Sequence, residues 1–364
     1  MEKEIVSCFL HLVRLGIEHI DSIDVADISQ LNLENWDALK SLATKQGLLG
    51  VVLDGLDKLP ITAYNMPPML KKQWIGEVLQ RYESRYELYR KTIAEMAGFY
   101  NKHGFQLMVL KGYACSLEWP KPEHRPCGDI DIWLFGHWRE ADATLTKEKG
   151  ITIDNSHHHH TVFYWRDFMV ENHYDFIEVH HHSSSPGIEK ILKEKGTDDS
   201  YSVDVDGEKV YLPSPDLHAL FLLRHSMEHF ASTDISLRQL LDWAFFVRAQ
   251  GKDIDWNWLE GVLREYGMKG LYDIFNAICV EDLGFDASLF PKSKIERRLK
   301  TRVLNEIISP EFKKNEPKAF FPRVYFKWCR WRANGWKHDL CYKGSRWSAF
   351  WSATWNHLLK PSSI

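Results

Sequence analysis

The chain has 364 residues, 44% of them hydrophobic and 26% charged, which is the composition of an ordinary globular protein with room for two or three cores. The net charge of -4 excludes a global charge field that would force a nucleic-acid or membrane partner. Six scattered cysteines without a Cys-x-x-Cys pair exclude a zinc knuckle or disulfide framework. No apolar run reaches membrane-spanning length, so we expect a cytoplasmic protein without a membrane span; the oligomeric state is not indicated.

The first part of the chain, residues 1–104, predicts a helical N-terminal region. Its clearest element follows the prolines at positions 67 and 68, where apolar residues recur at helical spacing until Gly104. Proline at the start of a helix and glycine just beyond its end are the usual boundary residues. We therefore expect a long amphipathic helix directly before the pattern changes.

Residues 105–213 predict a small α/β core, because short apolar runs alternate with turns. The expected strands lie at 105–112, 129–135, 159–165 and 174–182, followed by a hairpin at 201–213. We interpret the polar residues 171–173 as the connection between the third and fourth strands.

Residues 214–364 predict a helical C-terminal domain, which opens with Ser214 as N-cap and Pro215 as first helical residue. Its basic, tryptophan-rich tail is interpreted as a helical cap in which tryptophans fill the core and arginine stems cover them. A nucleic-acid surface is the less favoured alternative. The predicted fold class is α+β, a small mixed-sheet core flanked by N-terminal and C-terminal helical regions.

Two aspartates stand in the middle of the strand predicted at 129–135. Alternation places Asp129 and Asp131 on one face and the isoleucines between and after them on the other. Two neighbouring carboxylates repel, and both stay ionised only when a cation lies between them. Mg²⁺ or Mn²⁺ fits such a pair and accepts phosphate oxygens as further ligands. The pattern indicates a platform for a metal–triphosphate, and we rank a solvated edge strand second.

The neighbouring residues favour a phosphate ligand. Gly128 allows the backbone to approach a ligand closely, and Arg125 on the same loop can pair with phosphate. Lys111 and Gly112 end the preceding predicted strand. We expect all four residues to contact the nucleotide.

A metal site of this kind requires a third carboxylate from an adjacent strand. In the strand predicted at 174–182, alternation places Glu178 and His180 on the polar face. Glu178 is therefore the candidate third acid, and His180 is a candidate substrate contact.

The order of these motifs resembles that of the DNA-polymerase-β-like nucleotidyltransferase superfamily: Lys-Gly, then Gly-Asp-Ile-Asp, then Glu-Val-His, then a helix with Arg238. More closely, it resembles the bacterial family of uncharacterised nucleotidyltransferases, over about residues 100–245. The resemblance implies that Asp129 and Asp131 bind the metal and that Glu178 is the third ligand or the base. The superfamily's turn presents Gly-Gly or Gly-Ser, and here Lys111 is expected to hold phosphate as a point charge.

The resemblance also implies an activity. The protein would move a nucleoside monophosphate from an NTP, ATP or another, to a hydroxyl of an acceptor that the sequence does not identify, and release pyrophosphate. Its cofactor would be Mg²⁺ or Mn²⁺. The alternative is a catalytically silent nucleotide- or RNA-binding protein on the same fold. A glycosyltransferase ranks last, because the helical first hundred residues lack the βα units of its sheet.

Arg238 and Asp242 stand four residues apart on a predicted helix. They could form a surface ion pair, or Arg238 could reach a phosphate or the acceptor, and the sequence leaves both readings open.

The histidines invite a metal site but lack its usual spacing. In the runs at 157–160 and 180–182, neighbours on a strand alternate faces, and zinc ligands are usually spaced apart. We expect most of these histidines to be exposed or packed. His225 and His229 lack the glutamate of a zinc-protease motif, so we interpret them as a core or surface pair.

Overall fold

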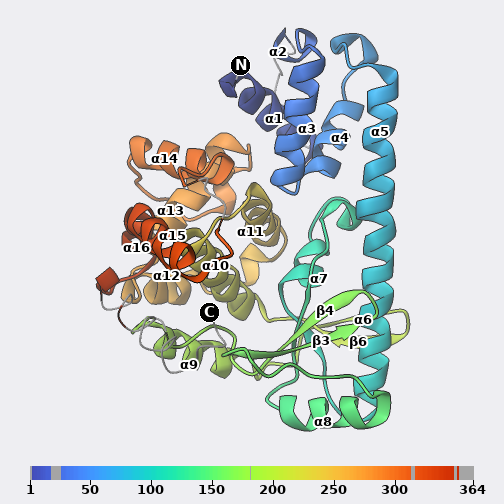
Figure 1. Cartoon of the computed structure of the whole chain (residues 1–364), viewed down its shortest axis with the longest axis vertical. Helices are drawn as coiled ribbons and strands as arrows, with labels where there is room; N and C mark the ends of the chain where they lie inside the picture. Colours follow the sequence, from blue (N-terminus) through green and yellow to red (C-terminus); the bar gives the residue numbers. More distant parts are fainter. Residues whose placement is uncertain (1, 18–25, 181, 313–315, 348–350, 352–364) are drawn as a thin grey trace.

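The computed structural model describes residues 2–17, 26–180, 182–312, 316–347 and 351. In this part of the chain, helices precede and follow one mixed sheet (Figure 1). The predicted fold class is therefore confirmed. None of the described helices combines the length and apolarity needed to cross a membrane.

The N-terminal helices pack into a compact group, in which α1 and α4 touch most closely. A side chain at Gly55 of α4 would lie 2.1 Å from the carbonyl oxygen of Leu12, so only glycine allows this approach. The described elements of the group are α1 (Glu2–Gly16), α2 (Ala26–Ser29), α3 (Leu33–Lys45), α4 (Leu49–Asp57) and the 3₁₀ turn η1 (Ile61–Ala63).

A long helical rod connects this group to the sheet (Figure 1). It consists of α5 (Pro68–Val78), one π-helical turn, η2 (Leu79–Glu83), and α6 (Ser84–Lys102). Pro68 occupies its first turn, where a missing backbone N–H costs nothing, and Gly104 follows its end with φ 81°. The long helix predicted from the sequence is confirmed.

The sheet has the order β3-β4-β2-β1-β6-β5. Its strands are β1 (Met108–Val109), β2 (Ile130–Trp133), β3 (His160–Trp165), β4 (Phe168–His173), β5 (Ser202–Val205) and β6 (Glu208–Tyr211). β2 lies antiparallel to β1 and parallel to β4, while β3–β4 and β5–β6 are antiparallel hairpins. The pairing of β2 with β4 positions the candidate site.

The strand predicted at 174–182 is wrong in the described residues 174–180 and 182, and the segment 171–173, interpreted as a connection, is the second half of the strand β4 (Phe168–His173). The chain reverses between Trp165 and Phe168, where Arg166 has φ 53°, and β4 pairs back along β3. The apolar residues that follow are buried for another reason. Phe176 stacks on Trp133 of β2 and makes an edge contact with Phe221, so its hydrophobicity serves packing between the sheet and a helix.

The two faces of the sheet differ in what covers them. Ile130 and Ile132 pack with residues of α6 and α8 (Trp138–Lys149) on one face. The other face meets α7 (Lys111–Ser116), the 3₁₀ turn η3 (Pro122–His124), α9 (Ser185–Lys195), α10 (Pro215–Ser232) and α11 (Leu237–Gln250). Asp131 of β2 and Asp129, which directly precedes the strand, lie on this second face.

The remaining helices form a layer beyond α10 and α11 (Figure 1). They are η4 (Gly251–Asp253), α12 (Trp256–Glu265), α13 (Lys269–Ala277), the π turn η5 (Ile278–Asp282), η6 (Ala287–Leu289), α14 (Arg297–Ile308), α15 (Phe320–Ala333) and α16 (Gly335–Cys341). The predicted tryptophan cap holds in part, because Trp331 and Trp336 are half-buried while Trp328 and Trp347 are exposed. Residues 348–350 and 352–364 of the tail lie outside the described residues.

Candidate functional site

The site begins with the register of two parallel strands. Asp131 of β2 lies directly beside Glu171 of β4, and Trp133 lies beside His173. Because neighbouring residues of parallel strands point to the same face, Asp129, Asp131, Glu171 and His173 all face away from α6 and α8. On the opposite face, Asn172 donates a hydrogen bond to Asp142 of α8 (2.8 Å), which anchors β4 from behind.

Two cationic side chains hold the buried Asp131 in its ionised form. Lys111 Nζ lies 2.7 Å and His173 Nε2 lies 3.1 Å from Asp131 Oδ1. Burial alone would raise the pKa of Asp131, but these two groups outweigh it and hold the pKa well below its usual range. Burial would lower the pKa of His173, yet its interactions with Asp131 and Glu171 raise it to about 9.

Asp129 is the least compensated acid of the group. Burial and repulsion from Asp131 raise its pKa, although Lys111 opposes the shift. Its backbone is fixed, because the Tyr89 hydroxyl of α6 donates to the Asp129 carbonyl oxygen at 2.9 Å. Gly112 leaves room for this bond, since a Cβ there would lie 2.3 Å from the Tyr89 hydroxyl.

These residues line a cavity of 460 Å³ between the sheet and the C-terminal helices. The strands supply the acids, and the segment around η3 contributes Arg125 and Gly128. The opposite wall comes from α10 and α11, with His225, His229 and Arg238. Burial lowers the pKa of His225, so this histidine is neutral near pH 7. The cavity thus places the carboxylates of Asp129, Asp131 and Glu171 opposite a wall that carries histidines and Arg238 as well as the acids Glu228 and Asp242.

A divalent cation fits the donor set at the strands. Asp131, Glu171 and His173 offer ligand atoms that all lie within 4.8 Å of one another. The Nδ1–H of His173 donates to the Asp175 carbonyl at 3.1 Å, which leaves Nε2 facing the acids. Metal-binding histidines typically anchor their second nitrogen in this way. Carboxylate oxygens with one imidazole suit Mg²⁺ or Mn²⁺.

Arg125 reaches a carboxylate of the protein. Its Nε and Nη2 donate to the two oxygens of Asp242 at 2.7 and 2.9 Å, and both residues are buried. Of the two interpretations left open for Arg238, the ion pair with Asp242 is therefore wrong, because Asp242 binds Arg125. Arg238 has no carboxylate partner within 4.0 Å among the described residues, and burial together with the charge of Arg125 lowers its pKa.

The predicted site residues thus fall into three groups. Lys111, Gly112, Asp129 and Asp131 meet at one end of the cavity, and Gly128, Arg125 and Arg238 line it nearby. Glu178 lies in the cavity wall on the segment after β4, where its Oε1 accepts from the His180 backbone N–H at 2.8 Å. His180 itself is exposed and lines a separate surface depression beside α9. The predicted role of Glu178 stays a prediction.

Glu171 and His173 line the cavity but were not among the site residues predicted from the sequence. A signal was present: Glu171-Asn172-His173 has the same Glu-x-His spacing as Glu178-Val179-His180, seven residues earlier. The alternating residues of 160–173 place it in a hairpin with a two-residue turn. With a turn at residues 166 and 167, alternation makes Glu171 a candidate third acid as well.

Comparison with known proteins identifies a family for this chain. No curated protein matches the chain. Among solved structures, an antigenic nucleotidyltransferase-like protein from Paracoccidioides brasiliensis is similar at 12% sequence identity, with a TM-score of 0.35, over 55% of this chain and 95% of that chain. A family model described as uncharacterised nucleotidyltransferase matches residues 32–281. Because this match covers more than half of the sequence, the chain belongs to the uncharacterised nucleotidyltransferase family.

Proposed function

We propose that this protein is a metal-dependent nucleotidyltransferase that moves a nucleoside monophosphate from an NTP, with ATP the first candidate, to a hydroxyl of its acceptor. One observation carries the proposal. The register of the two parallel strands sets Glu171 beside Asp131, and both residues line a cavity together with Asp129, which lies two residues before Asp131. Three carboxylates in one cavity repel one another unless positive charge joins them. Lys111 and His173 supply part of that charge at Asp131, and a divalent cation bound with the nucleotide would supply the rest.

The acids Asp131 and Glu171, with His173, would hold Mg²⁺ or Mn²⁺, and Asp129 would complete the acidic face. When bound, the divalent cation neutralises charge on the phosphate oxygens and the acids together. Lys111 has Asp131 as its partner and lies where it can also contact a phosphate. The open space around Gly128 lets the backbone contact the same ligand.

Arg238 is the cation of the opposite wall that is free to bind phosphate. Its guanidinium makes one long hydrogen bond, 3.5 Å, to the Pro126 carbonyl. Arg125, by contrast, is held by Asp242, so we assign it the role of bracing the loop before Asp129. A triphosphate would then lie between Lys111 and Arg238.

Two glutamates are candidates for the base that accepts the proton of the attacking hydroxyl. Glu171 lies beside Asp131 in the sheet, whereas Glu178 lies in the wall formed by the segment after β4. We assign Glu171 to the third carboxylate position of the family and Glu178 to the acceptor side of the cavity. Substitution by glutamine separates the roles, because glutamine keeps the shape and removes the charge.

Nucleotide binding tests the proposal without knowledge of the acceptor. Isothermal titration with a non-hydrolysable ATP analogue should show binding in Mg²⁺ or Mn²⁺ that is lost in EDTA. We expect Asp131→Asn and Glu171→Gln to weaken metal-dependent binding at least tenfold, and Glu140→Gln on the exposed face of α8 to leave it unchanged. Circular dichroism of each variant reports whether the fold is retained.

Glu178→Gln should bind the nucleotide with wild-type affinity. Once an acceptor is supplied, this variant should no longer transfer the labelled nucleoside monophosphate to it. The metal-dependent site would be refuted if the wild type in EDTA, and Asp131→Asn in Mg²⁺, bound the nucleotide as tightly as the wild type does in Mg²⁺. Such a result would favour a silent nucleotide- or RNA-binding protein.

A further inference from the structure

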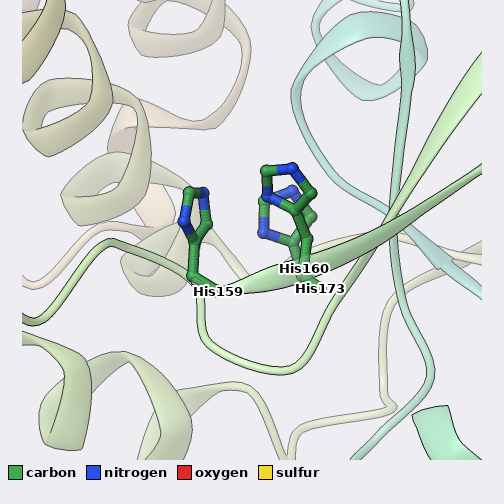
Figure 2. A group of neighbouring side chains, drawn as sticks. All are labelled: His159, His160 and His173. Carbon is green, nitrogen blue, oxygen red and sulfur yellow. The ribbon is translucent and has the colours of Figure 1, made fainter. Parts of the chain in front are cut away.

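A second group of possible metal ligands lies next to the acids, and its donor atoms are nitrogens. His159, His160 and His173 offer ligand atoms that lie within 4.8 Å of one another. The ring centroids are 4.3 Å apart for His159 and His160, and 5.3 Å apart for His160 and His173. All three imidazoles project from the same side of the ribbon (Figure 2).

The backbone holds this triplet together. His160, the first residue of β3, is the cross-strand partner of His173, the last residue of β4. Side chains of such a pair stand on the same face at contact distance. His159 is fixed by its own carbonyl, which accepts hydrogen bonds from the Tyr174 and Asp175 amides, each at 3.0 Å. The arrangement therefore follows from strand pairing and not from chance rotamers of a surface run.

Two ring nitrogens of the triplet lack the hydrogen-bond partners that buried imidazoles normally have, whereas both nitrogens of His173 are hydrogen-bonded. Among the described residues, neither His159 Nδ1 nor His160 Nδ1 has a hydrogen-bond partner, although both atoms are buried. His160 is itself 6% exposed. Buried polar atoms in native proteins are almost always satisfied. A simple packed cluster leaves these nitrogens unexplained, whereas a bound cation would accept their lone pairs.

Two carboxylates lie close to ring nitrogens of the triplet. Glu178 Oε2 is 3.8 Å from His159 Nδ1, and Glu171 Oε1 is 3.9 Å from His160 Nε2. Carboxylates next to ligand imidazoles orient the rings and raise their basicity. Glu171 can orient His160 through Nε2, and the negative charge of Glu178 next to His159 Nδ1 favours a cation at that nitrogen.

We propose that His159, His160 and His173 form a binding site for a transition-metal dication of the zinc type, separate in its ligands from the carboxylate site except for the shared His173. Three imidazoles favour zinc, cobalt or nickel over magnesium, which prefers oxygen. Three protein ligands also leave an open coordination position, as in catalytic zinc sites. This inference does not depend on nucleotidyl transfer, because it concerns metal binding alone.

Titration calorimetry with Zn²⁺ in a large excess of Mg²⁺ tests the site, since Mg²⁺ competes at the carboxylates but not at the imidazoles. The wild-type protein should bind one Zn²⁺ under these conditions, and Co²⁺ should give visible d–d absorption of a nitrogen-rich site. His159→Ala and His160→Gln should each weaken Zn²⁺ binding at least tenfold. His137→Ala, which removes an exposed histidine elsewhere, should leave the affinity unchanged.

A second comparison separates this proposal from the proposed function. Asp129→Asn should lose Mg²⁺-dependent nucleotide binding yet keep the Zn²⁺ affinity of the wild type. His159 is only half-buried, so His159→Ala should retain the fold, which the thermal midpoint checks. The proposed site would be overturned if His159→Ala and His160→Gln bound Zn²⁺ with the same affinity as His137→Ala and the wild type. It would also be overturned if the wild type did not bind Zn²⁺ in excess Mg²⁺.

Discussion

Removing the carboxylate of Asp242 should destabilise the protein far more than removing an acid from a surface ion pair. Asp242 and Arg125 are both 5% exposed, and the guanidinium binds the carboxylate through two hydrogen bonds of 2.7 and 2.9 Å. Trp119 Nε1 donates a third bond to the same carboxylate at 2.9 Å. In Asp242→Ala the buried guanidinium keeps only its 3.3 Å bond to the Pro126 carbonyl.

The expected magnitude follows from what is left behind. Breaking a buried ion pair by removing one partner costs about 3–5 kcal/mol, because the other charge stays buried without compensation. The unpaired Trp119 nitrogen adds about 1 kcal/mol. We therefore expect the free energy of unfolding of Asp242→Ala to fall by about 4–6 kcal/mol. For comparison, Glu311→Ala removes a surface partner of Arg302 and should cost below about 1 kcal/mol.

Urea unfolding followed by circular dichroism measures both changes. The double variant Arg125→Met/Asp242→Leu should recover much of the loss, because apolar residues of similar volume remove the buried charge as well as its partner. A loss below about 1 kcal/mol in Asp242→Ala would refute the reasoning, since it would mean that water reaches the guanidinium freely. Nucleotide binding should also weaken in Asp242→Ala, because Arg125 braces the loop that leads to Asp129.

Three further changes test other contacts. Gly112→Ala places a Cβ 2.3 Å from the Tyr89 hydroxyl and should displace its hydrogen bond to Asp129, so metal-dependent nucleotide binding should fall at least tenfold. Adding Tyr89→Phe to this variant removes the clashing hydroxyl and should restore part of the binding. If binding is not restored, the steric argument is contradicted. Burial lowers the pKa of His218 to about 4 from 6.5 unfolded, so its stabilisation is complete above pH 6.5 and is lost as the pH falls toward 4. Between pH 7.5 and 5 this loss is about 2 kcal/mol, and urea midpoints of His218→Gln should lack it. Gln46→Ala removes bonds to the first amide of α11 and to α14, and should lower the free energy of unfolding by about 2 kcal/mol in the same assay.

Local patterns in the sequence predicted part of the local geometry correctly. Alternation along 129–133 was enough to place both aspartates on one face, because the period of a strand is fixed by its backbone geometry. Proline and glycine likewise marked both ends of the rod formed by α5 and α6. These features depend on residues within one element, so no knowledge of the partners was needed.

Contacts between distant residues could not be predicted in this way. Asp242 had an obvious neighbour in Arg238, four residues before it, yet its partner is Arg125, 117 residues away. The bidentate geometry and burial favour this distant pair over a solvent-exposed pair on one helix. Which arginine remains available for phosphate therefore depended on how α11 packs against the loop before β2.

The strand predicted at 174–182 shows why alternation alone was not enough to identify the acid beside Asp131. Glu171 and Glu178 both stand in a Glu-x-His sequence, and both segments alternate apolar and polar residues. Alternation predicts which residues share a face, but it does not say whether the backbone pairs with another strand. After β4, the amides of Phe176 and Ile177 donate to the side chain of Glu189 on α9, each at 3.0 Å, and not to a neighbouring strand. A helix carboxylate thus replaces the strand partner there, which leaves Glu171 in the sheet beside Asp131.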